Sequence, residues 1–172
     1  MPKLYLVRHA EPAVTGVLLG QCDPPLSEAG RAQAAGIALP VRLAAIYSSP
    51  LRRALETARL LGPAARIETL DDLQEITYGN WDGKRWEEIE TAGPDLARWA
   101  LADWRAATAP GGERWADFEA RVASALRHVL AGPSPCAIVA HQAVNACVHE
   151  GLTGAAAREF QQSYGEVLAY EF

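Results

Sequence analysis

Residues 3–9 read Lys-Leu-Tyr-Leu-Val-Arg-His, a short apolar run that ends directly in two basic residues. An apolar run of this length, rich in strand-forming residues, predicts a strand buried on both faces. Residues 136–141, Cys-Ala-Ile-Val-Ala-His, repeat the pattern. Residues 43–48, Leu-Ala-Ala-Ile-Tyr-Ser, predict a third buried strand. Strands buried on both faces are typical of a parallel sheet that is covered by helices.

Helical patterns separate these strands. We expect helices over residues 28–38, 51–61, 86–91, 94–106, 115–131 and 143–150, and shorter strands over residues 66–68 and 167–172. Ser49 is expected to cap the helix at 51–61 with Pro50 at its first position, and Gly62-Pro63 to end it. Alternating strands and helices favour an α/β fold with three αβα layers, a mostly parallel central sheet and right-handed crossovers.

The composition limits the class of protein. The chain has 172 residues and a formal net charge of −5, so we expect a single domain over residues 1–172 with a helical lid insertion at about 71–112. The acidic balance disfavours nucleic acid or an anionic membrane as the main partner. The N-terminus lacks a signal-peptide pattern, and no apolar run is long enough for a membrane helix. Three cysteines without a disulfide framework favour a cytoplasmic location.

Basic residues follow the three buried strands. Arg8 and His9 end the strand that starts at residue 3, Arg52 and Arg53 follow the strand at 43–48, and His141 follows the strand at 136–140. The carboxyl ends of parallel strands share one edge of the sheet, which is where such folds bind ligands. Arginine matches phosphate oxygens, and histidine can attack phosphorus or donate a proton. The sequence therefore predicts a site for a phosphoryl group at this edge.

Several other site patterns are missing from the sequence. It contains neither a GxxxxGK[ST] phosphate loop nor a GxSxG nucleophile motif. His149-Glu150 begins like an HExxH zinc site, but Thr153 stands where the second histidine would be. No metal or other cofactor is implied.

Six stretches together identify a family. In chain order they are LYLVRHAEP, GQCDPPLSEAGRAQA, YSSPLRRALETA, LQEITYGNWDG, GGERWADFEARV and IVAHQ. They resemble the successive motifs of the histidine phosphatase superfamily, which has the phosphoglycerate mutase-like fold, and the resemblance runs from residue 4 to about residue 142. The short chain and its opening motif look most similar to the alpha-ribazole phosphatase branch.

The resemblance implies a role for individual residues. His9 would be the nucleophile that becomes phosphorylated, Arg8 and Arg53 would clamp the phosphate, and His141 would complete the pocket. Glu75 would be the proton donor on a mobile loop. Arg52 falls at a variable position of its motif and receives no role.

Two positions depart from the pattern of the family. Thr15 stands where many members have an asparagine that touches phosphate, and a threonine hydroxyl can substitute for it. Gln142 stands where members often have glycine, which changes the pocket wall. Both residues are included as candidate phosphate-binding or substrate-binding residues.

The implied chemistry sets two further expectations. One ring nitrogen of His9 must be free to attack, so the other should donate to a backbone carbonyl and fix the tautomer. Glu75 should have a raised pKa through partial burial near Tyr78 and Trp81, because it must carry a proton.

The expected activity is hydrolysis of a small phosphorylated metabolite by a metal-independent phosphomonoesterase. Alpha-ribazole 5'-phosphate is one candidate substrate, and a broad substrate range is another. The alternatives are a phosphoglycerate mutase, although those are usually longer, and a phosphatase of protein phosphohistidine. A non-catalytic phosphate-binding module is the third, although such a module would be expected to lose His9 or Glu75. The oligomeric state cannot be predicted from the sequence.

Overall fold

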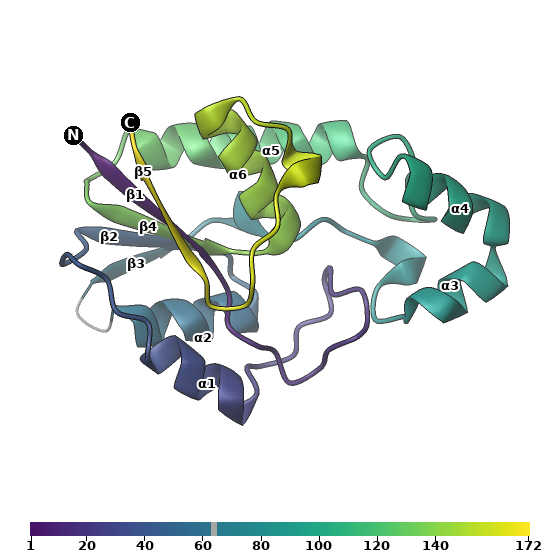
Figure 1. Cartoon of the computed structure of the whole chain (residues 1–172), viewed down its shortest axis with the longest axis horizontal. Coiled ribbons are helices and arrows are strands. Elements are labelled where there is room, and N and C mark those ends of the chain that lie inside the picture. Colours follow the sequence, from purple (N-terminus) through teal and green to yellow (C-terminus); the bar gives the residue numbers. More distant parts are fainter. Residues whose placement is uncertain (63–64) are drawn as a thin grey trace.

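The computed structural model describes residues 1–62 and 65–172, which form a five-stranded sheet in the order β3-β2-β4-β1-β5 (Figure 1). The strands are β1 Lys3–Arg8, β2 Ala45–Ser48, β3 Arg66–Thr69, β4 Cys136–Ala140 and β5 Val167–Glu171. The first four strands are parallel to one another, and β5 lies antiparallel to β1 at the edge. The expected α/β fold with a mostly parallel sheet is confirmed.

Helices cover both faces of this sheet (Figure 1). They are α1 Glu28–Ala35 and α2 Arg52–Leu61 on one face, and α5 Trp115–Leu130 and α6 Gln142–Thr153 on the other. Successive strand residues point to opposite faces. Leu4 and Leu6 therefore join the core with Phe118 of α5, while Tyr5 and Val7 join a second core with α2. These two cores are the contacts of a three-layer αβα arrangement.

The register of the sheet aligns the strand ends that carry the basic residues. Arg8 of β1 pairs with Ala140 of β4, and Ser48 of β2 pairs with Val139. The backbone N–H of His9 donates to Ala140 O (2.9 Å) one residue beyond this pairing. The residues that follow β1, β2 and β4 therefore meet at one edge of the sheet.

A helical arm stands apart from the sheet (Figure 1). It contains α3 Trp86–Ala92 and α4 Pro94–Ala102. Its base is closed by hydrogen bonds from Asn80 N to Pro110 O and from Glu113 N to Thr77 O, both 2.8 Å. Gly79 allows this closure, because its φ is +52° and a Cβ there would lie 2.4 Å from the backbone of Gly111 and Gly112. The role of this arm as a lid stays a prediction.

One expected helix start is wrong. The helix expected after Ser49 and Pro50 begins only at Arg52, with Leu51 as its N-cap. The start is displaced because the backbone of Leu51 is extended (φ −62°, ψ 137°). Ser49 Oγ still accepts from the N–H of Leu51 (3.3 Å), and it also lies 2.8 Å from Nε2 of His141. Local capping rules do not predict this second, tertiary contact. The helix ends before Gly62 as expected, and Pro63 lies outside the described residues.

Other boundaries shift by a few residues. The α4 helix ends at Ala102 instead of residue 106, because the Asp103 carboxylate accepts from the N–H groups of Arg105 and Ala106 and starts a new turn. The α6 helix is longer than expected and ends at Gly154, whose φ is +75°. Within the described ranges, no helix combines the length and the apolar character needed to cross a bilayer.

Candidate active site

Two histidines lie side by side at the carboxyl edge of the sheet. The ring centroids of His9 and His141 are 5.1 Å apart, and both side chains are buried. His9 follows β1, and His141 caps α6 immediately after β4. The strand ends thus bring together residues that are 132 positions apart in the chain, as the sequence predicted.

The ring of His9 is fixed in one orientation. Its Nδ1 lies 2.8 Å from the carbonyl oxygen of Ala10, so Nδ1 carries the proton and donates it to that carbonyl. The expected backbone partner is therefore present. Burial lowers the pKa of His9 to about 3, and the positive charges of Arg53 and Arg8 act in the same direction. His9 is neutral at ordinary pH, with the lone pair of Nε2 available.

His141 is held from the β2 side. Its Nε2 lies 2.8 Å from Ser49 Oγ, which also accepts a hydrogen bond from the N–H of Leu51. Burial, with the nearby charges of Arg53, holds the pKa of His141 well below its usual value, so this ring is neutral too. Because Leu51 already donates to the Ser49 oxygen, the hydroxyl hydrogen is free to point at Nε2 of His141. In that arrangement Nδ1 of His141 carries the ring proton.

The two arginines, of which Arg53 is buried and Arg8 partly buried, donate to backbone carbonyls. Arg8 donates through Nη1 to Gln162 O (2.6 Å). Arg53, with 0% exposure, donates through Nη1 to Cys22 O and through Nη2 to Leu19 O. These bonds do not use every N–H donor of the two guanidinium groups. Among the described residues, Nε of Arg8, Nε of Arg53 and Nδ1 of His141 are buried without a hydrogen-bond partner.

Such unpaired buried donors are unusual, because a buried polar group without a partner costs about 1–3 kcal/mol. Three of the five such donors in the described ranges belong to the two arginines and the histidine of this cluster, and the other two are Nε of Arg105 and Nε1 of Trp115. An anion with several acceptor oxygens would satisfy the three donors of the cluster together, and a phosphoryl group has that chemistry.

Glu75 lies in the same cluster and is only 5% exposed. Its Oε1 accepts from the N–H of Ile76 (3.1 Å), and its Oε2 accepts from the N–H of Ala143 in the first turn of α6 (3.3 Å). Burial raises the pKa of Glu75 against the opposing effect of these two hydrogen bonds and of Arg53. The shift has the expected direction, and it favours a carboxylic acid that can donate a proton.

The backbone around Glu75 is fastened by Arg121 of α5. Arg121 donates to the carbonyl oxygens of Asp72, Gln74 and Glu75 at 2.7–3.1 Å. The same guanidinium pairs in a fork with both carboxylate oxygens of Glu113 (2.7 and 2.9 Å). The ion pair between Arg121 and Glu113 therefore fixes the backbone segment that carries Glu75.

A second carboxylate fixes the loop that covers Arg53. Asp82 accepts from the N–H groups of Gly20, Gln21 and Cys22 at 2.7–3.0 Å. The carbonyl groups of the same short loop accept from Arg53. The N–H groups of this loop are therefore bonded to Asp82 and its carbonyl groups to Arg53, which holds the loop against Arg53.

The structure gives the remaining candidate residues other surroundings. Thr15 is exposed on the loop between β1 and α1. Both ends of the Gln142 amide are bonded to the segment at 160–162, since Nε2 donates to Phe160 O and Oε1 accepts from Gln162 N. Arg52 points to Glu56 at the surface (3.7 Å). Contact of Thr15 or Gln142 with phosphate stays a prediction.

Sequence reasoning missed several residues of the site. The ring of Tyr164 lies 4.2 Å below the guanidinium carbon of Arg8 and 5.5 Å from the ring of His9. Gln162, which is buried, donates to Leu6 O and Glu166 O and accepts from Asn145. Both residues come from the irregular segment before β5, and no motif or periodicity marks them.

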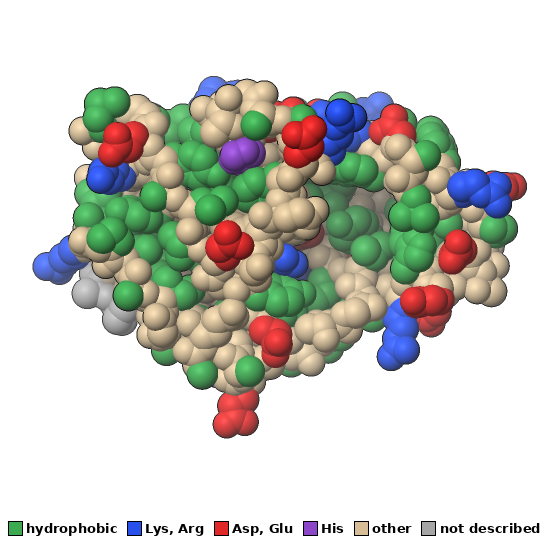
Figure 2. All heavy atoms as spheres, viewed as in Figure 1, with side chains coloured by type: hydrophobic (Ala, Val, Ile, Leu, Met, Phe, Trp, Pro, Cys, Tyr) green, Lys and Arg blue, Asp and Glu red, His purple; other side chains and the backbone are tan. Residues whose placement is uncertain are grey.

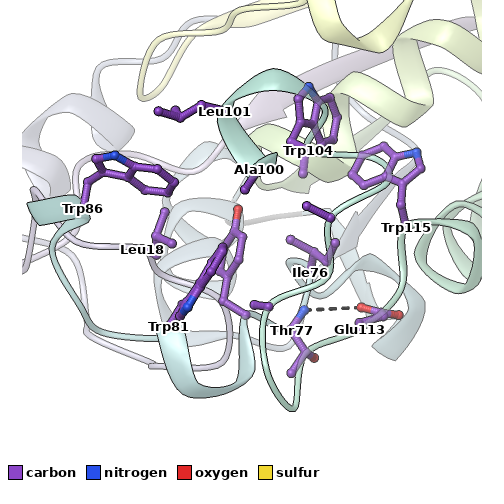
Figure 3. Close-up of a pocket in the computed structure, with 14 residues that line it drawn as sticks. Leu18, Ile76, Thr77, Trp81, Trp86, Ala100, Leu101, Trp104, Glu113 and Trp115 are labelled. Carbon is purple, nitrogen blue, oxygen red and sulfur yellow. Dashed lines mark hydrogen bonds between the residues drawn. The ribbon is translucent and has the colours of Figure 1, made fainter. Parts of the chain in front are cut away.

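An apolar cavity of about 320 Å³ lies close to this cluster, and Figure 3 shows residues that line it. Ile76 and Ala143, whose N–H groups hold the Glu75 carboxylate, both line it. In Figure 3, Trp81 and Trp86 lie on one side of the view, and Trp104 and Trp115 on the other. The cavity therefore meets the site through these two neighbours of Glu75, and neither Glu75 itself nor the two arginines line it.

Within residues 1–62 and 65–172, no three His, Cys, Asp or Glu side chains are grouped so that they could hold a metal ion. The acidic groups near the cluster are instead bonded to backbone N–H groups or to Arg121.

Comparison with known proteins agrees with this geometry. A model of the histidine phosphatase superfamily (branch 1) matches residues 4–171. The chain is 38% identical over 137 residues to phosphoserine phosphatase 1 of Hydrogenobacter thermophilus, which covers 75% of this chain and 64% of that protein. It is 32% identical over 153 residues to the adenosylcobalamin/alpha-ribazole phosphatase of Salmonella typhimurium, covering 83% and 75% of the two chains.

A solved structure agrees as well. The alpha-ribazole phosphatase from Shigella flexneri matches with a TM-score of 0.85 and 26% identity, over 97% of this chain and 89% of that chain. The chain spans less than two thirds of the Hydrogenobacter protein. It belongs to the histidine phosphatase superfamily, and the resemblance seen in the sequence is confirmed.

Proposed function

We propose that this chain is a phosphomonoesterase that hydrolyses a small phosphate ester through a phosphohistidine at His9, without a metal ion. One observation carries the proposal: the buried donors of Arg8, Arg53 and His141 lack partners, and they surround a neutral histidine whose Nε2 is free. Phosphoryl transfer depends on positioning and on stabilising charge at the phosphoryl oxygens. This cluster supplies both.

In the first half of the reaction, Nε2 of His9 attacks phosphorus while the bond from phosphorus to the leaving oxygen breaks. The arginines and Nδ1 of His141 bind the phosphoryl oxygens. Glu75 gives its proton to the leaving oxygen, so the alcohol departs neutral. The buried position of Glu75 supports this role, because burial keeps the carboxyl group protonated to higher pH.

In the second half, Glu75 is a carboxylate and takes a proton from water. The water oxygen attacks phosphorus, the bond between phosphorus and Nε2 breaks, and phosphate leaves. His9 and Glu75 return to their starting protonation states. The hydrogen bond from Nδ1 of His9 to Ala10 O is kept throughout, which supports a ring that does not turn between the two halves.

The partner in this proposal is a small phosphorylated metabolite in the cytoplasm, and nucleic acid is not a partner. The net charge of −5 supports this, because the cationic groups of the site are buried in an otherwise acidic chain. Alpha-ribazole 5'-phosphate and phosphoserine are both candidate substrates, since relatives named for each match this chain.

The proposal is tested by trapping the intermediate. A rapid alkaline quench during turnover of a phosphomonoester should give a base-stable, acid-labile phosphoenzyme, which mass spectrometry locates on the peptide that contains His9. His9→Asn should lose this species and lower kcat about 10³-fold or more. The exposed His128 offers a matched control, and His128→Ala should keep both. Full turnover in His9→Asn would overturn the proposal, as would loss of activity on adding a chelator.

A further inference from the structure

The cavity beside Glu75 lies where the leaving group of the proposed reaction must go. Glu75 is the proposed donor to the leaving oxygen, and its carboxylate is bonded to Ile76 and Ala143 on the cavity wall. The phosphate-binding donors come from Arg8, Arg53 and His141, and neither these three residues nor Glu75 itself lines the cavity, which meets the site at Ile76 and Ala143. A substrate that reaches both sides of Glu75 therefore has its phosphate in the cluster and its alcohol in the cavity.

The wall of this cavity is apolar and largely aromatic. Trp81 and Trp86 pack edge to face with centroids 6.1 Å apart, and Trp104 and Trp115 do so at 4.2 Å. Tryptophans in such pairs offer flat faces and edges to an aromatic guest. The volume of about 320 Å³ is within the range of small-molecule sites.

The charges on the wall are equally informative. None of the described side chains that line the cavity belongs to Lys, Arg or His. Its one carboxylate, Glu113, is already paired in a fork with Arg121 and accepts from Thr77 N. A carboxylate or ammonium group on a substrate would lose its water here without gaining a partner of opposite charge, which is unfavourable.

The mouth of the cavity also exposes apolar surface. Leu101 is 65% exposed and Trp104 is 39% exposed, and both line the cavity. Figure 2 shows a hollow with hydrophobic side chains between the body of the molecule and the α3–α4 arm. Large apolar side chains left open at the rim of a pocket are typical of a binding site.

We propose that this cavity is a leaving-group subsite for an uncharged, aromatic body, and that it disfavours phosphoserine and phosphoglycerate, whose charged groups would enter it. The inference rests on the proposed function, since it assumes that Glu75 protonates the leaving oxygen. It separates the candidate substrates by chemistry. An ester of a primary alcohol that carries a neutral aromatic ring fits, and an amino acid or hydroxy acid phosphate does not.

The test compares three phosphate esters of primary alcohols: 2-phenylethyl phosphate, ethyl phosphate and phosphoserine. All three release poor leaving groups, so differences in kcat/KM report binding of the alcohol part. We expect 2-phenylethyl phosphate to exceed ethyl phosphate by about 10-fold or more, the range for filling an apolar pocket. Phosphoserine should not exceed ethyl phosphate.

A matched pair of variants on α4 examines the cavity itself. Leu101→Lys places a cation at the mouth of the cavity. Because Leu101 is 65% exposed, this substitution should not destabilise the fold. It should shift the ratio of kcat/KM for 2-phenylethyl phosphate to kcat/KM for phosphoserine about 10-fold toward phosphoserine. Trp99→Lys adds the same charge on the same helix at a residue that is 51% exposed and does not line the cavity. It should leave the ratio unchanged.

The outcomes separate the two proposals. If none of the three esters is hydrolysed, the proposed function fails. If all are hydrolysed but phosphoserine exceeds ethyl phosphate, the function stands and the subsite is overturned. An equal shift in Leu101→Lys and Trp99→Lys would also overturn the subsite, because it would show a general effect of charge.

Discussion

The molecule is built differently on the two sides of Glu75. On one side, His9, His141, Arg8 and Arg53 form a buried cluster in which backbone carbonyls and one hydroxyl fix each side chain. On the other side, the cavity wall is made of apolar and aromatic side chains, some of them open to solvent. The cluster sits on strand ends, and much of the cavity wall comes from the arm that stands off the sheet (Figures 1 and 3).

This difference suggests a division of labour. A group that must bind the same phosphoryl oxygens in every substrate needs a rigid frame, and the register of β1, β2 and β4 provides one. A surface that contacts only the variable part of the substrate can lie on a separate segment. We therefore expect changes on the cluster side to affect all substrates alike, and changes on the cavity side to affect selectivity.

Apart from loss of the nucleophile itself, the largest effect is expected at the junction, in Glu75→Gln. The amide keeps the shape of the side chain but cannot give a proton to the leaving oxygen, so kcat should fall about 10²–10³-fold. Binding of phosphate should change little, since Glu75 is not among the donors to it. The measurements are kcat for 2-phenylethyl phosphate and competitive inhibition by inorganic phosphate. Equal losses in both would contradict the acid role.

The same variant has a signature in pH. Because burial raises the pKa of Glu75, its acid form persists above the usual range, and kcat of the native protein should fall only as pH rises through that raised value. His9 stays neutral down to about pH 3 and adds no loss on the alkaline side. In Glu75→Gln the alkaline fall in kcat should vanish. Its persistence would assign the fall to another group.

A smaller effect is expected below the junction, in Arg121→Met. The methionine keeps apolar bulk beside Phe118, whose ring lies 4.7 Å from the Arg121 guanidinium, but removes the bonds to the carbonyls around Glu75. Glu113 loses its partner as well, and because this ion pair is only partly buried, the free energy of unfolding should fall by about 2 kcal/mol, less than for a fully buried pair. Arg121 acts as a positioning residue, so kcat should fall about 10-fold with inhibition by phosphate unchanged.

The matched control is Arg127→Met, an exposed arginine on the same helix. It removes the same charge and should change neither stability nor kcat. Denaturant unfolding and the pH profile of kcat distinguish positioning from mere folding, since displacement of Glu75 should also move the alkaline limb. A stability loss with an unchanged kcat and pH profile would restrict Arg121 to a structural role.

The cluster side is readable from the sequence because its residues follow strands. An apolar run that ends in a histidine predicts both the strand and the edge at which the side chain emerges, so the sequence alone places His9 and His141 at that edge. Tyr164 and Gln162 cannot be placed in this way, because their segment follows no periodic pattern. It reaches the site through the pairing of β5 with β1 and the bond from Gly165 N to Arg8 O.

The cavity side is less readable for a related reason. The tryptophans at 81, 86 and 104 belong to the arm between the sheet elements, and their spacing does not show that they face one another. That contact depends on the closed base of the arm at Gly79 and on bonds between residues about 30 positions apart. Ser49 shows the same limit at one residue, since the sequence predicts its bond near the start of the helix but not the contact of its hydroxyl with His141.

Ser49→Ala gives the smallest expected effect and the sharpest test of the division of labour. Loss of the hydroxyl removes the partner of Nε2 in His141, a hydrogen bond of about 1 kcal/mol, so kcat/KM should fall about 5-fold. The fall should be equal for 2-phenylethyl phosphate, ethyl phosphate and phosphoserine, and inhibition by phosphate should weaken in proportion.

Ser48→Ala is the matched control, because Ser48 is equally buried but donates to Ser49 O rather than to a histidine. The Ser48→Ala protein should change in stability but not in its inhibition by phosphate. If Ser49→Ala instead altered the ratio between the esters, the cluster and the cavity would not act independently, and the two sides of Glu75 would have to be treated as one site.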